Sequence, residues 1–511
     1  MMRALFFTLL AFVLVTSYSQ NQIKLYPEQS QTQISKHIYG HFAEHLGRCI
    51  YDGMYAGDSY DIPKTDGVRN DVIDALKKLQ IPNLRWPGGC FADTYHWKDA
   101  IGPKDQRKPI ENTSWGGRED NSFGTHEFLN LCELLDAEPY LAVNMNTGSV
   151  QEAVEWEQYV NNANGSSYLT DLREANGREK PWNVKYWGIG NESWDCGGDM
   201  TADYYSNLYK RYAVAMTNYG NTDGLFRIAV GPGQPDYEWT ETIMKQVPAR
   251  RIEGLSIHHY SVFNWSNKGS SYAFSEEEYF KTMKRAWFME EFITKNSVVM
   301  DKYDEEKRVK LIVDEWGGWY NTMPEGNGAL YQQNTIRDAM IAGMTLNIFN
   351  NHADRVHMAN LAQTVNVLQA VILTNEEKMI LTPTYHVMEM YKVHQDAQLV
   401  PLEIESASYT MNGESIPSVS SSASLDTEGK LHISLTNIDH LNEQEITVDL
   451  GSIQLNKVTG RILTSARVQD RNTFDQPEEV TPETFRGAKI TKGSLKVTLP
   501  KNSVVILELS K

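Results

Sequence analysis

The chain has 511 residues, and its 66 acidic against 48 basic residues give a formal net charge of −18 at pH 7. This balance argues against nucleic acid and anionic membrane surfaces as partners, and the length suffices for two or three domains. The four cysteines, Cys49, Cys90, Cys132 and Cys196, form neither a CxxC motif nor a Cys/His metal spacing, so no metal site is expected. Their spacing leaves their disulfide state open.

The first residues predict a signal peptide over residues 1–19. Met1–Arg3 is short and positively charged, Ala4–Val15 is almost entirely apolar, and Thr16–Ser19 is small or polar. The apolar run is shorter than the roughly 20 residues that span a bilayer, which disfavours the alternative of a membrane anchor. We therefore expect a secreted or periplasmic location and no membrane insertion.

Residues 20–35 are expected to contribute a strand, within Gln22–Gln33, to the β-sandwich that the C-terminal sequence predicts. Residues 36–394 follow a different pattern, in which short apolar runs alternate with amphipathic helices. Val72, Ala75, Leu76 and Leu79 share one helical face behind a predicted N-cap at Asn70, and a second such face is formed by Phe128, Leu131, Cys132 and Leu135. The predicted strands are Ile38–Glu44, Asn83–Trp86, Pro139–Asn144, Val184–Ile189, Arg227–Val230, Gly254–His258, Val309–Val313 and Leu346–Asn350.

Strand–helix alternation predicts a parallel sheet, and eight such units indicate a (β/α)8 TIM barrel over residues 36–394. A doubly wound open sheet is the alternative, but the sequence has no Gly-rich dinucleotide fingerprint to favour it. From residue 395 to 511 apolar and polar residues alternate, as in Leu431, Ile433 and Leu435, with Gly, Asn, Asp and Ser between the runs. This pattern predicts a C-terminal antiparallel β-sandwich, which the Ser-rich stretch Ser406–Ser424 enters as a turn-rich connector.

Two predicted strands end in a glutamate beside an aromatic residue. The fourth strand runs into Asn191-Glu192-Ser193-Trp194, and the seventh runs into Asp314-Glu315-Trp316. Active sites of such barrels lie at the carboxyl ends of the strands. One isolated glutamate would be read as a surface residue, but two at the mouth of one barrel predict the carboxylate pair of a glycoside hydrolase.

Other residues near strand ends fit the same pocket. The amide of Asn191 can donate and accept hydrogen bonds, which suits a sugar hydroxyl beside the reacting carbon. Glu44 offers an acceptor for sugar hydroxyls, and Tyr260 can donate to the nucleophile. Arg85 can hold a carboxylate ionised, although a purely structural ion pair is equally expected. Of the neighbours His258 and His259, one is expected simply to pack.

Taken in order, these motifs resemble those of the α-L-arabinofuranosidases of glycoside hydrolase family 51. The resemblance runs from Ile38-Tyr39-Gly40 to the C-terminal domain, through Phe42–Arg48, Leu84–Trp97, Trp187–Trp194, His258–Tyr260 and Asp314–Trp316. It implies a retaining, exo-acting enzyme that removes terminal α-L-arabinofuranosyl residues from arabinan, arabinoxylan or derived oligosaccharides. It also implies a barrel with a C-terminal sandwich, a homo-oligomer and no cofactor.

The resemblance assigns roles to individual residues. Glu192 is implied as the general acid/base and Glu315 as the nucleophile, with their carboxyl groups about 5–5.5 Å apart rather than the roughly 6.5–9.5 Å of an inverting enzyme. Substrate-pocket or nucleophile-supporting positions are implied for Glu44, Arg85, Cys90, Trp115, Asn191, His258, Tyr260, Trp319 and Gln363. Some members of the family have Asn at the position of Cys90. The resemblance therefore implies a thiol near the sugar at this position, and it implies that Cys90 is not used in a disulfide.

Two other functions compete with this interpretation. A β-xylosidase or endoglucanase on the same barrel would share a Gly-Asn-Glu motif after the fourth strand but not the segments Phe42–Arg48 and Arg85–Cys90. A non-catalytic carbohydrate-binding protein would keep aromatic residues but would not need both glutamates.

Overall fold

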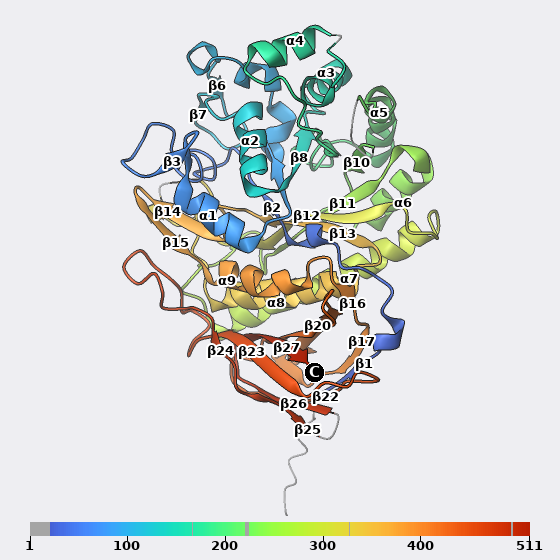
Figure 1. Ribbon diagram of the computed structural model, residues 1–511, viewed down its shortest axis with the longest axis vertical. Helices are drawn as coiled ribbons and strands as arrows, with labels where there is room; N and C mark the ends of the chain where they lie inside the picture. The colour runs from blue at the N-terminus through green and yellow to red at the C-terminus, as the bar shows by residue number, and fades with distance from the viewer. Residues whose placement is uncertain (1–20, 166, 220–223, 327, 492–493) are drawn as a thin grey trace, which may run out of the picture.

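The computed structural model describes residues 21–165, 167–219, 224–326, 328–491 and 494–511, so the predicted signal peptide lies outside the described residues. A barrel with its helices forms the larger part of the molecule and a β-sandwich forms the smaller part, with α8 and α9 between them (Figure 1). Among the described residues, no helix is both long and apolar enough to cross a membrane.

Eight parallel strands close into a barrel, as predicted. The fourth and seventh of them, counted along the chain, are the strands that lead to Glu192 and Glu315. Each strand pairs with the one that precedes it in the chain, and the last strand pairs with the first to close the barrel. The strands are β2 Gly40–Phe42, β5 Asn83–Trp86, β8 Glu138–Val143, β9 Tyr186–Ile189, β10 Phe226–Ala229, β11 Gly254–Ser261, β12 Lys310–Gly318 and β13 Val356–Ala362.

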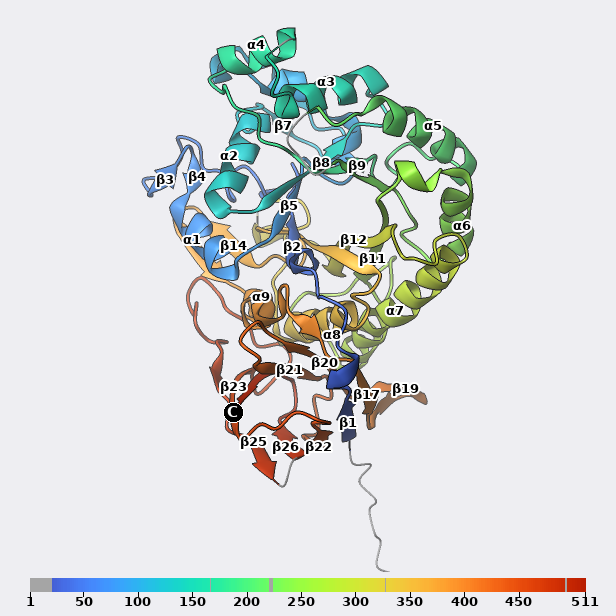
Figure 2. The same ribbon diagram turned by 45° about the vertical axis from the view of Figure 1, so that its right-hand side comes forward.

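Helices surround the barrel, as Figure 2 shows for α2, α3, α5, α6 and α7. The helices are α1 Asn70–Leu79, α2 Thr125–Leu135, α3 Val150–Asn161, α4 Tyr168–Ala175, α5 Ala202–Ala215, α6 Tyr237–Gln246, α7 Glu276–Asp301, α8 Ile336–Asn351 and α9 Pro383–Tyr391. The predicted apolar faces of α1 and α2 are buried. The N-cap of α1 is Arg69 rather than Asn70, because the Asn70 side chain accepts a hydrogen bond from Thr65 Oγ1 instead of capping the helix.

The predicted eighth strand, Leu346–Asn350, is wrong. These residues belong to α8, and the eighth barrel strand is β13. The helix α8 is buried along almost its whole length, because it lies between the barrel and the C-terminal sandwich. A helix that is buried on all sides loses the 3.6-residue alternation of polar and apolar positions, so its apolar run reads like a strand.

Two sheets form the C-terminal sandwich, as predicted. One has the order β17-β1-β22-β26-β25, in which the N-terminal strand β1 pairs parallel to β22 and antiparallel to β17, and the other has the order β16-β20-β21-β27-β23-β24. Their facing apolar side chains form one core, which includes Ile433, Leu435, Val448 and Val497. The strands are β1 Asn21–Leu25, β16 Gln398–Leu399, β17 Leu402–Glu405, β20 Val419–Leu425, β21 Leu431–Asn437, β22 Gln444–Asp449, β23 Lys457–Thr464, β24 Glu483–Thr484, β25 Ala488–Thr491, β26 Ser494–Leu499 and β27 Ser503–Ser510.

The Ser-rich stretch is more ordered than the turn-rich connector that the sequence predicts. It forms a hairpin of β18 Ser408–Met411 and β19 Glu414–Pro417, followed by β20, which lies between β16 and β21 in the second sheet. Two of the buried serines of β20 contact polar side chains of α8. Ser422 Oγ donates to Asn347 Oδ1 at 3.0 Å, and Asn347 Nδ2 donates to Ser420 Oγ at 3.0 Å.

Candidate active site

A cavity of about 400 Å³ opens at the carboxyl ends of the barrel strands. Nine of the sequence-predicted site residues line it: Glu44, Cys90, Trp115, Glu192, His258, Tyr260, Glu315, Trp319 and Gln363. Arg85 and Asn191 are not in the lining. They are almost fully buried and contact the carboxylates or their neighbours from behind.

Glu315 lies within β12, and donors from other strands hold its carboxylate. Arg85 of β5 donates from Nη1 to Glu315 Oε1 at 2.9 Å, and the Tyr260 hydroxyl of β11 donates to Oε2 at 2.7 Å. The other Arg85 terminal nitrogen, Nη2, donates to Asn191 Oδ1 at 2.6 Å. Arg85 is therefore an ion-pair partner beneath the pocket and not a residue of its surface.

Glu192 lies just beyond the end of β9, on a tight turn. Its own φ is 38°, in the left-handed region that few non-glycine residues adopt, and Gly190 before it has φ 87°. The turn is closed by backbone bonds from Asp195 and Gly197 to the Glu192 carbonyl, at 2.8 and 3.1 Å. The carboxylate accepts a hydrogen bond from Nδ1 of His258 at 2.9 Å.

His258 lies between the two glutamates. Its Nδ1 is 3.6 Å from Glu315 Oε2, and one carboxylate oxygen of each glutamate and Nδ1 all lie within 4.8 Å of one another. This upper limit on the nearest oxygens is closer to the separation of about 5–5.5 Å between the carboxyl groups of retaining glycosidases than to the roughly 6.5–9.5 Å of inverting ones.

The surroundings move the two carboxyl pKa values in opposite directions. Burial and then the negative Glu315 raise the pKa of Glu192, against the hydrogen bond from His258. Burial also acts to raise the pKa of Glu315, but positive charge on His258 and Arg85 outweighs it and lowers that pKa. One carboxyl is thus stabilised as the acid and the other as the anion, which is the division that a retaining glycosidase requires.

Glu44 is held on the opposite side of the pocket. Its Oε1 accepts hydrogen bonds from the backbone N–H of Phe91 at 3.0 Å and from Trp115 Nε1 at 2.9 Å, and its Oε2 accepts one from Gln363 Nε2 at 3.0 Å. Burial and the nearby Glu315 raise the pKa of Glu44 to about 7. Trp115 and Gln363, which only the family resemblance indicates, are therefore direct partners of Glu44.

Gly88 and Gly89, which follow Pro87, let the backbone pass close to the carboxylates of Glu44 and Glu315. A Cβ added at Gly88 would lie 2.7 Å from Glu44 Cγ, and one added at Gly89 would lie 2.9 Å from Glu315 Oε1. Any larger side chain at these positions would displace a carboxylate of the pocket.

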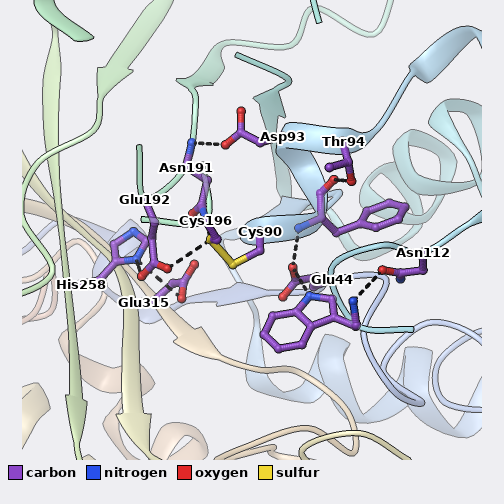
Figure 3. The surroundings of a disulfide bond; sticks show 12 residues. Glu44, Cys90, Asp93, Thr94, Asn112, Asn191, Glu192, Cys196, His258 and Glu315 are labelled. Carbon is purple, nitrogen blue, oxygen red and sulfur yellow. Dashed lines mark hydrogen bonds and ion pairs between the residues drawn. A yellow bond between two sulfur atoms is a disulfide. The ribbon is translucent and has the colours of Figure 1, made fainter. Parts of the chain in front are cut away.

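Asp93, which sequence reasoning missed, fixes the backbone before Glu192. It is fully buried in the 3-10 helix Cys90–Thr94, and its Oδ2 accepts from the N–H of Asn191 at 2.9 Å (Figure 3). Its Oδ1 accepts from the N–H groups of Met145 and Asn146, at 2.7 and 3.2 Å. Because it neither ends a strand nor lines the pocket, its position in the sequence carries no signal of this role.

The prediction that Cys90 is not used in a disulfide is wrong. Cys90 and Cys196 form a disulfide bond that links the 3-10 helix to the turn after Glu192 (Figure 3). The Sγ of Cys196 lies 3.6 Å from Glu192 Oε2. The two cysteines are 106 residues apart and meet because the segments that follow β5 and β9, two strands separated by β8, come together at the barrel mouth. Cys49 and Cys132 are buried and free.

Further pocket residues come from loops and from α7. Sequence reasoning missed Trp194, Gln234, Trp265, Arg285 and Phe288, all of which line the cavity. Trp194 directly follows Asn191-Glu192-Ser193, so its position beside this motif could have predicted that it lines the pocket. The other residues lie beyond the strand ends, where the rule that locates a barrel's active site gives no guidance.

Two groups of side chains in the described ranges have the spacing to hold a metal ion: Glu192, His258 and Glu315, and Cys90, Glu192 and Cys196. In the first group the two carboxylates and the histidine are engaged with one another and with Arg85 and Tyr260, and the two sulfurs of the second group are bonded to each other. Glycoside hydrolysis by two carboxylates needs no metal.

Comparison with known proteins agrees with this geometry. Residues 75–277 match the family model of the α-L-arabinofuranosidase 1 domain, and residues 314–503 match that of the α-L-arabinofuranosidase C-terminal domain. An intracellular exo-α-L-arabinofuranosidase of Bacteroides ovatus is 48% identical over 506 residues, covering 98% of each chain. The chain therefore belongs to the α-L-arabinofuranosidases of glycoside hydrolase family 51.

Solved structures give the same result. The GH51 arabinofuranosidase from Xanthomonas axonopodis pv. citri superposes with a TM-score of 0.93 at 42% identity, covering 96% of this chain and all of the other. The α-L-arabinofuranosidase from Thermotoga maritima, solved with arabinose, superposes with a TM-score of 0.84 at 33% identity over 96% of this chain and 99% of the other.

The comparison overturns the predicted secreted or periplasmic location. The Bacteroides ovatus relative aligns over 98% of this chain and is named as an intracellular enzyme. The prediction rested on the charge and hydrophobicity of residues 1–19 alone.

Proposed function

We propose that Glu315 is the nucleophile and Glu192 the general acid/base of a double displacement that releases terminal α-L-arabinofuranosyl residues. The observation that carries this assignment is the contrast between the two carboxyl groups. Glu315 accepts charge-assisted bonds from Arg85 and Tyr260 that favour its anion, whereas the Glu192 carboxyl has a raised pKa that favours its acid.

In the first step, Glu192 donates its proton to the glycosidic oxygen as the bond from that oxygen to the anomeric carbon breaks. A carboxylate oxygen of Glu315 attacks the same carbon, so a covalent arabinosyl-enzyme forms and the aglycone leaves as an alcohol. In the second step, Glu192 as a carboxylate takes a proton from water, whose oxygen displaces Glu315. Two inversions leave the anomeric configuration unchanged.

The remaining residues position the sugar and the carboxylates. Glu44 and Gln363 offer an acceptor and a donor to sugar hydroxyls, with Trp115 and Trp319 as aromatic walls and Cys90 contributing a disulfide sulfur. Asn191 is held between Arg85 and Asp93, where its amide is fixed beside the reacting centre. His258 and Tyr260 bond to the two catalytic carboxylates.

Arabinan, arabinoxylan and the oligosaccharides derived from them are the proposed sources of the arabinofuranosyl group. Aryl α-L-arabinofuranoside and aryl β-xyloside, assayed side by side with NMR detection of the first anomer released, test the activity. We expect rapid release of α-arabinose from the first and little reaction of the second. Faster turnover of the xyloside, or release of β-arabinose, would refute the proposal.

We also propose, from the family resemblance, that the protein forms a homo-oligomer. Light scattering at several protein concentrations tests it, and a monomer throughout would remove this part without affecting the catalytic assignment.

A further inference from the structure

A groove on the outer side of α7 continues from the catalytic pocket. This second cavity, of about 410 Å³, lies between α7 and the β18–β19 hairpin, which projects from the C-terminal domain in Figure 2. Its volume is within the range of about 300–1,000 Å³ that is usual for small-molecule sites. Arg285 and Phe288 line both cavities, so the groove and the pocket meet across this helix.

The junction lies close to the proposed acid. Glu192 must face the oxygen of the leaving group, so the aglycone leaves the pocket on the side of Glu192. His258, which bonds to Glu192, is followed in β11 by His259, whose Nε2 lies 2.8 Å from the carbonyl oxygen of Arg285. Burial lowers the pKa of His259 to about 4, so its neutral ring donates Nε2–H to that carbonyl. This hydrogen bond connects α7 to β11, the strand whose His258 is hydrogen-bonded to Glu192.

Arg285 has unused hydrogen-bonding capacity at this junction. Its guanidinium lies 5.2 Å from the centre of the Phe288 ring, and its Nε is buried without an acceptor in the described part of the chain. A buried donor that lacks a partner is destabilising, so an acceptor is expected from a ligand or from water. The hydroxyl and ring oxygens of a sugar are such acceptors.

The chemistry of the groove suits a neutral ligand. Half-buried Trp287 and buried Ile416 give it an apolar floor. Apart from Arg285, its charged side chains are paired with one another or with neighbours: Lys284 with Glu414, Lys295 with Glu291, and Glu290 with His352. An aromatic surface with a rim of paired charges favours the faces and hydroxyl groups of sugar rings over an anionic ligand.

We propose that this groove binds the aglycone side of the substrate, namely the second and later sugars of a neutral oligosaccharide that carries terminal arabinofuranose. The proposal rests on the function proposed above. Trp287 provides the surface against which a sugar ring packs, and Arg285 binds the sugar that joins the pocket to the groove. The groove therefore discriminates long substrates from short ones.

The test compares kcat/KM on an aryl α-L-arabinofuranoside with kcat/KM on oligosaccharides of increasing length, with α-linked arabino-oligosaccharides in one arm and arabinoxylo-oligosaccharides in the other. Two variants probe the groove: Trp287→Ala removes its aromatic surface, and Ser415→Arg fills it from the exposed hairpin without removing a packed side chain. Tyr204→Ala on α5 is the control, because Tyr204 is a 60% exposed aromatic residue that lines neither cavity.

In the unaltered enzyme we expect kcat/KM to rise with chain length in at least one arm, which also identifies the polymer. In both groove variants the ratio of long-substrate to aryl-substrate kcat/KM should fall by about threefold to tenfold, as expected for the loss of one aromatic contact, and the control should keep it. If kcat/KM does not depend on oligosaccharide length in either arm, or if both groove variants keep the ratio of long-substrate to aryl-substrate kcat/KM, the groove does not bind the aglycone side of the substrate. Failure of the unaltered enzyme on the aryl arabinofuranoside overturns instead the function on which it rests.

Discussion

Glu315 and Glu192 face the same pocket, but the chain holds them in different ways. Glu315 lies within a barrel strand, and its carboxylate accepts from donors on two other strands. Glu192 lies on a turn with a left-handed φ of 38°, and its carboxylate bonds to a histidine that can itself titrate. In the proposed mechanism Glu315 must stay charged, and Arg85 and Tyr260 donate to it in addition to the nearby His258. Glu192 must lose and regain a proton, and its carboxylate is hydrogen-bonded to the titratable His258.

The turn is not loose, because Asp93 and the disulfide hold it on its two sides. Asp93 accepts a backbone hydrogen bond from Asn191 on one side of Glu192, and the disulfide fixes Cys196 on the other. The strand β12 therefore places the proposed nucleophile among donors from two other strands, while the position of the proposed acid/base depends on a turn that a neighbouring 3-10 helix holds. Substitutions on the two sides should therefore differ in how their effects depend on the leaving group.

The largest effect is expected for the nucleophile. Glu315→Gln keeps the shape of the side chain but removes the anion, so kcat should fall by at least about 10⁴-fold on every substrate. Steady-state assays with a good and a poor leaving group measure it. Retention of activity on one of the two substrates would contradict the nucleophilic role.

The acid/base should show a leaving-group dependence instead. Glu192→Ala should lose about 10²–10⁴-fold in kcat/KM on poor leaving groups and much less on very good ones, since those need little protonation. An equal loss on both would argue against Glu192 as the acid.

The pH profile sharpens the same comparison. Activity needs Glu315 ionised, and its pKa lies below the usual value, so activity should fall only as the pH drops below the normal range of a glutamate. It needs Glu192 protonated, and the raised pKa of Glu192 sets the pH above which activity declines. With a good leaving group, Glu192→Ala should abolish this alkaline decline in kcat/KM and keep the acidic one.

A smaller effect is expected from the hydroxyl that supports the nucleophile. Tyr260→Phe removes the 2.7 Å hydrogen bond to Glu315 and leaves the ring. Because that bond favours the anion, its loss should raise the pKa of Glu315, move the acidic decline to higher pH and lower kcat by about tenfold. An unshifted acidic limb would show that Tyr260 does not set the charge of Glu315.

The supports of the turn should give the smallest losses of activity. Asp93→Asn replaces a carboxylate oxygen with an NH₂ group that cannot accept from the backbone, so the protein should lose about 1–3 kcal/mol of unfolding free energy. If Asp93 acts through Glu192, kcat/KM should fall more with a poor leaving group than with a good one. Equal losses would reduce Asp93 to a general structural role.

The disulfide provides a separate check on the turn. The double variant Cys90→Ser/Cys196→Ser should lower the stability of the protein by about 2–4 kcal/mol while Asp93 continues to hold the turn, so activity at low temperature should change by less than about threefold. Thermal unfolding and aryl-substrate assays measure the two effects. A collapse of activity in a folded double variant would make the disulfide, and not Asp93, the principal support.

The sequence was most informative where chemistry coincides with a strand end. The positions of Glu192 and Glu315, like those of Glu44 and Tyr260, follow from apolar strands that stop at the barrel mouth. The pattern failed at α8, which is buried on both sides and so shows no helical period, and at β20, whose serines are buried against the asparagines of α8.

Residues that act from outside the strand ends could not be predicted in this way. Asp93 bonds to backbone groups that are distant in sequence, and Cys90 and Cys196 meet only in the folded barrel. Arg285 and Phe288 reach the pocket from the middle of a long helix, where they resemble ordinary surface and core residues. Their roles depend on which elements the closed barrel brings together.

The assignment of the nucleophile is the central claim, and trapping the covalent intermediate tests it most directly. Glu192→Ala, incubated with an aryl arabinofuranoside that has a very good leaving group, should accumulate arabinosyl-enzyme because no base remains to activate water. Peptide mass spectrometry after rapid acid quenching should find one arabinosyl group on Glu315. Attachment at another residue, or no covalent adduct despite a burst of aryl alcohol, would contradict the account.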